Sequence, residues 1–250
     1  PLQPIVAVDH PAIEVIQVAG GKISRRYRDM FISDTTLQMG LNQWHGLESI
    51  EWLNGQKKGA VIVGAHLGNV NAMRVAAKSK TSKQIKALMY TDHTQRFNKL
   101  LEQLNPDASK DIIPLETIDA MTVLELQSLV ERGDTLGILA DRAAVGSQDR
   151  TIEVPFFGKP APFPQGPWIL ASLLKCQIFL LFCIRTDRSH YEVFIEPFAE
   201  QIILPRQQRE DARVEACAAQ HVDKVELEAD RERPLRARPS CRGREVGQHP

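Results

Sequence analysis

Short apolar runs alternate with amphipathic segments along the middle of the chain. The run at residues 60–63, AVIV, lies between Gly59 and Gly64 and predicts a buried parallel strand, because both faces of such a strand are covered. Further strands are expected at the later apolar runs, which are residues 85–90, 111–114, 135–140, 177–184 and 191–195.

Helices are predicted between these strands, where apolar residues recur at helical spacing. The expected ranges are residues 70–78, 95–104, 118–132 and 165–174. Asn69 can cap the first of these helices, and Gly133 fits the end of the third. Strands that alternate with helices predict an α/β fold with a mostly parallel central sheet flanked by helices.

Composition allows a sizeable core and excludes several classes of function. The 250 residues are 43% hydrophobic and 25% charged, with a formal net charge of zero, which gives no reason to expect nucleic acid as a partner. The four cysteines include no CxxC pair and no metal-binding cluster is evident, so no metal is expected. The chain also lacks a GxGxxG or Walker loop and a GxSxG elbow, which argues against nucleotide binding and against an ordinary α/β hydrolase.

Residues 1–205 are expected to form a single domain, and residues 206–250 a charged, partly disordered tail. A charged surface helix is expected within residues 206–229, whereas RERPLRARPSCRGR at 231–244 holds six arginines and too few apolar residues to fold. Near the beginning, Arg25, Arg26 and Arg28 are expected together on a helix, either as a solvated face or in contact with anionic lipid headgroups.

The segment GAHLGNVN, residues 64–71, carries the candidate chemistry. It joins a buried strand to a helix, and ligand sites in open α/β sheets form at the carboxyl ends of strands. On one continuous helix His66 and Asn71 would lie about 140° apart. They can therefore meet only if His66 lies in the turn, where Asn71 would hold one imidazole nitrogen and leave the other to accept a proton. From the pattern alone, a purely structural, hydrogen-bonding histidine is the favoured interpretation.

GAHLGNVNAMR resembles the HLGN-type block of the lipid A and lysophospholipid acyltransferase superfamily. Similar blocks follow in order at residues 89–106, 137–142 (GILADR) and 154–171 (VPFFGKPAPFPQGPWILA), so that the resemblance covers residues 20–205. It implies a glycerolipid-acyltransferase-like fold. It also implies a histidine general base, which is His66 here, paired with an acid five positions on. Asn71 stands at the acid position, so weak activity is expected unless another carboxylate substitutes.

The resemblance implies direct transfer of a fatty-acyl group from an acyl thioester to a hydroxyl of a lipid or glycolipid. The donor would be an acyl carrier protein or acyl-coenzyme A, and the thioester is a co-substrate, so no cofactor is expected. The expected substrate-binding residues are Asn69, Arg74, Asp141, Arg142, Phe163, Pro164, Gln165 and Gly166. Among them, Arg142 is a candidate for binding phosphate, and backbone N–H groups near Gln165 and Gly166 are candidates for stabilising the charge on the thioester oxygen.

Two other functions remain open at this point. One is hydrolysis of the same thioester by water, and the other is a catalytically impaired lipid-binding homologue, which Asn71 favours. The resemblance further implies a bacterial protein in peripheral contact with the cytoplasmic face of the inner membrane, or anchored there by a segment missing from this chain. The longest apolar stretch, residues 168–184, is interrupted by polar residues and does not predict a membrane span.

Overall fold

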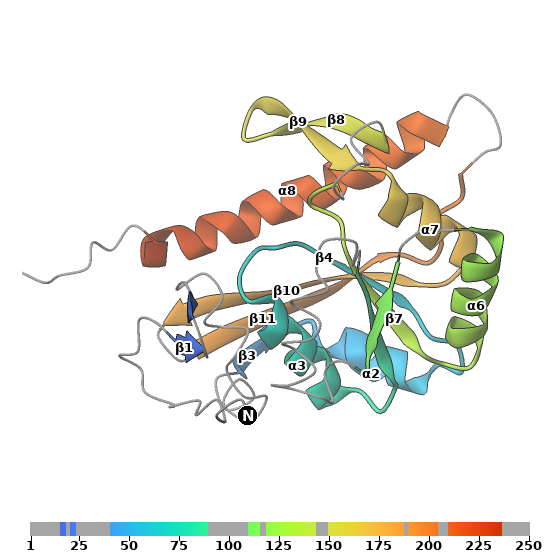
Figure 1. Cartoon of the computed structure of the whole chain (residues 1–250), viewed down its shortest axis with the longest axis horizontal. Coiled ribbons are helices and arrows are strands. Elements are labelled where there is room, and N and C mark those ends of the chain that lie inside the picture. Colours follow the sequence, from blue (N-terminus) through green and yellow to red (C-terminus); the bar gives the residue numbers. More distant parts are fainter. Residues whose placement is uncertain are drawn as a thin grey trace, which may run out of the picture.

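The computed structural model of the chain has a seven-stranded central sheet between two layers of helices (Figure 1). The structure describes residues 16–18, 21–23, 41–89, 110–115, 119–143, 150–187, 190–204 and 210–236. In spatial order the sheet consists of β3 (Leu41–His45), β11 (His190–Ala199), β10 (Ile178–Asp187), β4 (Val61–Gly64), β7 (Thr135–Leu139), β5 (Ile85–Met89) and β6 (Ile112–Pro114).

Most of this sheet is parallel, as predicted. Strands β10, β4, β7, β5 and β6 pair in parallel in that order. On the other side β11 pairs antiparallel with β10, and β3 pairs parallel with β11. Every residue of β4 is buried, which agrees with its unbroken apolar run. The α/β prediction is therefore confirmed.

The edge strand β3 of the main sheet and two further pairs of strands were not predicted from the sequence. One is β1 (Ile16–Val18) with β2 (Gly21–Ile23), and the other is the hairpin of β8 (Thr151–Phe156) with β9 (Lys159–Pro164). Prolines count against a strand because they cannot donate a hydrogen bond to a neighbour. The β8–β9 ribbon accommodates them because it has only two strands, so that each has a free edge; there Pro155 lies opposite Pro160.

The predicted helices that fall on described residues are present. They are α3 (Val70–Lys80), α6 (Ala120–Glu131) and α7 (Gly166–Leu174), and α2 (Leu47–Gly55) was not predicted. Asn69 caps α3, and Gly133 follows α6 with φ 103°, a left-handed conformation that suits glycine. The helix predicted at 95–104 and the arginines 25, 26 and 28 lie outside the described residues.

The sheet separates two hydrophobic cores. On one face α2 and α3 pack against side chains such as Ile62, Phe179 and Leu181. On the other face α6, α7 and a long C-terminal helix cover Val63, Phe182 and their neighbours. Figure 1 shows this arrangement, with α2 and α3 below the sheet and the long helix crossing above it.

The long helix, α8 (Glu210–Arg236), overlaps the range 206–229, in which a charged surface helix was predicted. It is more than a surface element, because one stripe of it is buried. The members of this stripe lie three or four residues apart, the spacing of one helix face. They are Val214, Cys217, Ala218, His221, Val222, Val225 and Glu228. Helix α8 therefore packs into the same hydrophobic core as the central sheet.

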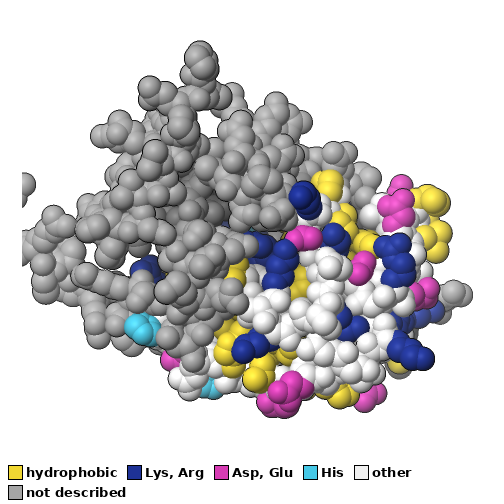
Figure 2. Space-filling view, turned by 90° about the horizontal axis from the view of Figure 1, so that it is seen from below, with side chains coloured by type: hydrophobic (Ala, Val, Ile, Leu, Met, Phe, Trp, Pro, Cys, Tyr) yellow, Lys and Arg dark blue, Asp and Glu magenta, His cyan; other side chains and the backbone are white. Residues whose placement is uncertain are grey.

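The surface seen in Figure 2 mixes charges of both signs. Within the described part of this face, lysine and arginine side chains alternate with acidic and hydrophobic ones and form no continuous basic patch. Asp111 illustrates such mixing, since it forms ion pairs with Lys78 and Lys86. Burial raises the pKa of Asp111, but these two lysines outweigh burial and hold the pKa below its usual value.

Candidate active site

The candidate site lies where two neighbouring central strands end. Gly64 of β4 is paired with Leu139 of β7, and the backbone contact continues one step further, because Ala140 N–H donates to Gly64 C=O at 3.0 Å. His66 and Asp141 each stand two residues beyond that pair. Parallel strands end at the same edge of a sheet, so the sheet brings these two side chains together although they are 75 positions apart.

His66 and Asp141 form a close polar pair. Nδ1 of His66 lies 2.8 Å from Oδ1 of Asp141, and the two side chains are 40% and 15% exposed. An ionised carboxylate only accepts hydrogen bonds, so Nδ1 carries the proton and Nε2 is left to accept one. The imidazole is therefore oriented by a carboxylate, and its other nitrogen is in the form that can accept a proton.

The charge of Asp141 is maintained by its neighbours. The other carboxylate oxygen accepts from Nε and Nη2 of Arg142, each at 3.3 Å. Burial raises the pKa of Asp141, but the hydrogen bond and charge of His66, together with the charge of Arg142, outweigh burial, so the pKa lies below its usual value. Asp141 is therefore ionised at neutral pH, as a carboxylate that stabilises an imidazolium must be.

The turn after His66 is held to β11 and to the start of α3. Asn69 Oδ1 accepts from the backbone N–H groups of Asn71 and Ala72, both at 3.0 Å, and Asn69 Nδ2 donates to the Tyr191 hydroxyl at 3.2 Å. Asn69 is buried, and both its amide oxygen and its amide nitrogen form hydrogen bonds inside the protein. Its observed role is to fix the turn that presents His66.

The structure gives the His66 ring a different partner from the one expected. Asn71 was expected to hold one imidazole nitrogen, but Asp141 occupies Nδ1. Asn71 is the second residue of α3, and its Oδ1 accepts from Arg74 Nε at 3.0 Å, one turn along the same helix. The carboxylate therefore comes from the neighbouring strand β7 and not from the helix that follows His66.

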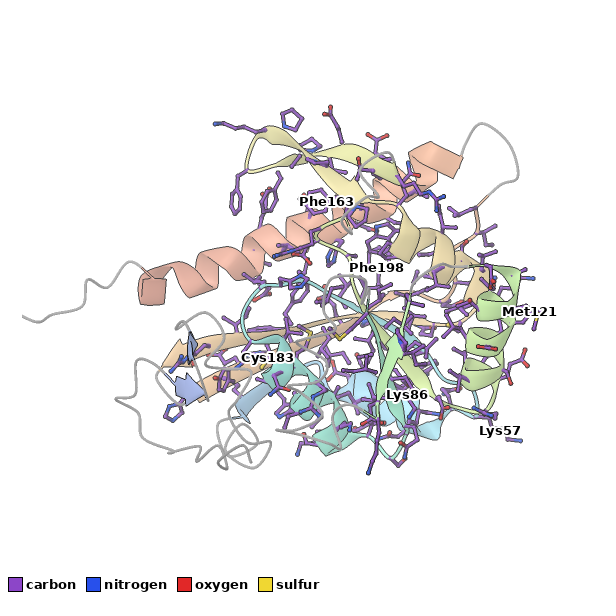
Figure 3. All side chains as sticks on the ribbon, in the orientation of Figure 1. Lys57, Lys86, Met121, Phe163, Cys183 and Phe198 are labelled. Atoms are coloured by element: carbon purple, nitrogen blue, oxygen red, sulfur yellow. The ribbon has the colours of Figure 1, made fainter. Side chains whose placement is uncertain are left out.

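The four residues Phe163, Pro164, Gln165 and Gly166 span the junction between β9 and α7. Phe163 and Pro164 are buried, and Phe163 packs edge-on against Phe156 with ring centroids 5.7 Å apart. Figure 3 shows Phe163 in the region where the β8–β9 hairpin adjoins α8. Gln165 N–H donates to Arg150 C=O at 3.1 Å, so this backbone donor, one of those suggested for the thioester oxygen, is already used.

His221 of α8 is a buried titratable residue that the sequence did not single out. It is 0% exposed, and its ring stacks on Phe182 with centroids 5.9 Å apart. Burial lowers the pKa of His221 from 6.5 to about 4, against a weaker opposing effect of the Asp141 charge. The ring is therefore neutral at physiological pH.

The pKa of His221 predicts a loss of stability in mild acid. The unfolded chain binds a proton at His221 below about pH 6.5, whereas the folded chain does so only near pH 4, so stability falls as the pH drops through this window. We expect the free energy of unfolding, measured by urea denaturation, to decrease by about 2–3 kcal/mol through this residue between about pH 7 and about pH 4.5. His221→Phe should lack that portion of the decrease, and an unchanged pH dependence in His221→Phe would contradict the assignment.

Neither a metal cluster nor a membrane-spanning helix is found among the described residues. No three His, Cys, Asp or Glu side chains of the described ranges are grouped as metal ligands would be. None of the helices described is both long enough and apolar enough to cross a bilayer.

Comparison with known proteins identifies the family. The profile described as bacterial lipid A biosynthesis acyltransferase matches residues 14–227. The match includes both strands that carry the His66–Asp141 pair, and it extends into α8 as far as Leu227. A search of curated proteins finds no matching relative. Because the profile matches most of its length, the chain belongs to the bacterial lipid A biosynthesis acyltransferase family.

Proposed function

We propose that this protein transfers a fatty-acyl group from an acyl thioester to a hydroxyl of a lipid or glycolipid acceptor, with His66 as the general base. Family membership indicates acyl transfer to a lipid. The observation that carries the finer proposal is the 2.8 Å contact between His66 Nδ1 and Asp141, which orients the imidazole and leaves Nε2 to accept a proton.

In the proposed reaction His66 first takes up a proton and later gives it back. Nε2 of His66 takes the proton of the acceptor hydroxyl, and the oxygen attacks the thioester carbonyl carbon. The carbon–sulfur bond of the tetrahedral intermediate then breaks, and the departing thiolate takes the proton back from Nε2. Asp141 stabilises the imidazolium that exists between these steps. The products are an ester and a free thiol, and the protein is unchanged.

The donor is proposed to be an acyl carrier protein or acyl-coenzyme A, with no cofactor. Arg142 is a candidate for binding a phosphate of the donor or acceptor, because its side chain is 56% exposed beside Asp141. Arg74 stands on the first turns of α3, next to Asn71, and remains a second candidate. Both would place a positive charge near the strand end that carries His66.

A peripheral contact with the cytoplasmic face of the inner membrane is part of the proposal. The adjoining helices α6 and α7 expose large apolar side chains, which are Met121, Leu124, Ile169 and Leu173. The two helices are joined by a hydrogen bond from Gln127 Nε2 to Leu173 C=O at 2.7 Å, and Figure 3 shows Met121 on the outer side of α6. Exposed apolar groups of this kind favour contact with a lipid surface.

Two other functions compete with this proposal. A lipid-binding homologue without activity was favoured by the amide of Asn71, but Asp141 supplies a carboxylate to His66 and removes that argument. Hydrolysis of the thioester would use the same base with water as the acceptor. The two reactions differ in the acceptor and hence in the product, so the product distinguishes them.

The test is an assay of the purified full chain with labelled dodecanoyl-acyl carrier protein or dodecanoyl-coenzyme A and an under-acylated lipid A in detergent. We expect the label to appear in the lipid and not as free dodecanoic acid. Free acid as the main product would indicate hydrolysis, and no turnover with either donor would contradict the enzymatic proposal.

The variant Asn71→Glu tests which residue supplies the acid. Because Asp141 already occupies Nδ1, a carboxylate at position 71 is expected to change kcat/KM less than about threefold, a difference below 1 kcal/mol. A gain of about 100-fold in Asn71→Glu would show that Asp141 does not serve as the partner of His66.

A further inference from the structure

The buried ring of His221 packs against aromatic rings, although its two nitrogens are polar. Its partners are two aromatic rings: Phe182 stacks on it at an interplanar angle of 19°, and Trp168 contacts it edge-on, with centroids 5.6 Å apart. Within the described part of the chain, neither His221 nitrogen has a hydrogen-bond partner, and Nε1 of Trp168 lacks one as well. Three buried polar atoms on two touching rings therefore have no protein partner among the described residues.

Such an arrangement is unfavourable if His221 serves only to fill the hydrophobic core. Burying a polar atom without a hydrogen bond destabilises the folded protein, and phenylalanine has a ring that could stack on Phe182 without this penalty. Unpaired polar groups in a native interior therefore call for a specific explanation, such as a bound molecule.

The position of His221 connects this polar group with the candidate active site. His221 stacks on Phe182 of β10, which stands two residues beyond Leu180, and Leu180 is paired with Val63 of β4. Ala65, two residues beyond Val63, precedes His66. Phe182 and Ala65 belong to the same core, on the face that α8 covers. His221 thus packs on the face of the sheet that α8 covers, at the end of β4 that leads to the base, and the charge of Asp141 acts on it.

The chemistry of this group favours an uncharged ligand atom. Lys224, the nearest lysine on α8, forms ion pairs with Glu196 at 2.8 Å and with Glu228 at 3.8 Å. The ring of His221 is neutral at physiological pH. An anionic phosphate would need a cation in such a buried place, whereas a carbonyl or hydroxyl oxygen needs only the N–H donors that the two rings provide.

We propose that the ring nitrogens of His221 and Trp168 form a binding site for an uncharged oxygen atom of the lipid substrates, beside the His66–Asp141 pair. This inference rests on the proposed function. The oxygen belongs either to the thioester carbonyl of the donor or to a hydroxyl or ester group of the acceptor. In both cases His221 binds substrate and takes no part in proton transfer.

The first experiment compares His221→Phe and Trp168→Phe with the wild type. Both variants keep an aromatic ring and remove the nitrogens. We expect the melting temperature of His221→Phe to stay level or rise, because an unpaired buried group is lost. At the same time kcat/KM should fall about tenfold in each variant, the effect of about one lost hydrogen bond to substrate. A higher KM for the thioester identifies the donor as the ligand, and a higher KM for the lipid identifies the acceptor.

Val222→Ala is the matched control. Val222 is the next residue on α8 and is also fully buried, but it carries no polar atom. Its truncation should lower the melting temperature by several degrees and leave kcat/KM of the folded protein within about twofold. If His221→Phe is as stable as the wild type and equally active, the ring is a core residue that at most holds a water molecule, and the proposal is overturned.

A second measurement does not depend on turnover or on the folding of a variant. In the wild type labelled with ¹⁵N at histidine, a non-reactive amide analogue of dodecanoyl-pantetheine, or an under-acylated lipid A, should shift the ring nitrogen resonances of His221. No shift with either probe overturns the proposal. A shift in a protein that shows no acyl transfer would support this binding site and contradict the proposed function, so the two failures are distinguishable.

Discussion

Replacing His66 with alanine is expected to lower kcat/KM for acyl transfer about 1,000-fold, the range measured for the loss of a general base. The effect should fall on kcat, because the imidazole acts on the reacting proton. The fold should survive, since the His66 side chain is 40% exposed and Asp141 keeps its contact with Arg142. Steady-state kinetics and the melting temperature would be measured on the same preparation.

His45 provides a closely matched control. Its Nε2 lies 3.1 Å from Oε2 of Glu192, and its side chain is 37% exposed, so it is also a half-exposed histidine paired with a carboxylate. It belongs to β3, at the far end of the sheet from β7. His45→Ala should therefore keep transfer within about twofold. Equal losses in His45→Ala and His66→Ala would mean that His66 has no special chemical role.

Replacing Asp141 with asparagine is expected to lower kcat about 100-fold to 1,000-fold. The amide is nearly isosteric, but it carries no charge to stabilise the imidazolium, and its NH₂ group can donate to Nδ1 and favour the wrong tautomer. The loss should be smaller than that of His66→Ala, because the base itself remains. Measurements of kcat and KM for both substrates would separate this effect from weaker binding.

The variants Asp141→Asn and Asn71→Glu, alone and combined, test which position must carry the carboxylate. Glu192→Gln, which makes the same change beside His45, is the control and should keep transfer near the wild-type level. If the double variant Asp141→Asn, Asn71→Glu recovers most of the lost kcat, a carboxylate on α3 can replace one on β7. If Asp141→Asn alone is as active as the wild type, the orienting role assigned to Asp141 is wrong.

The alternation of apolar runs and amphipathic segments was enough to predict the parallel part of the sheet. Strands such as β4 and β7 are buried on both faces, so their sequences are continuously apolar and easy to recognise. The β8–β9 ribbon was missed because it contains several prolines and lies outside the main sheet. Its two strands form because they pair with each other, and this pairing leaves no recognisable pattern of apolar and polar residues in either strand.

The site was predictable only in part. His66 stood out because it follows a buried strand within a recognisable motif, but its partner was sought at Asn71, a few residues away. A usable signal existed, since His66 and Asp141 each follow a buried strand by the same short interval. Recognising it requires knowing that β4 and β7 are neighbours, and that knowledge comes from the tertiary pairing. A signal for His221 also existed, because apolar residues such as Val214, Ala218 and Val225 recur at helical spacing and place His221 on the same helix face.

The placement of His66 and Asp141 on adjacent central strands also bears on motion during turnover. Their separation is set by the hydrogen-bonded pairing of β4 with β7 and by the hydrogen bond from Ala140 to Gly64 just beyond it. Central parallel strands are among the stiffest parts of a domain. We therefore expect this dyad to be preorganised, so that no closing movement is needed to assemble it, and the slow steps to be the arrival and departure of the lipids.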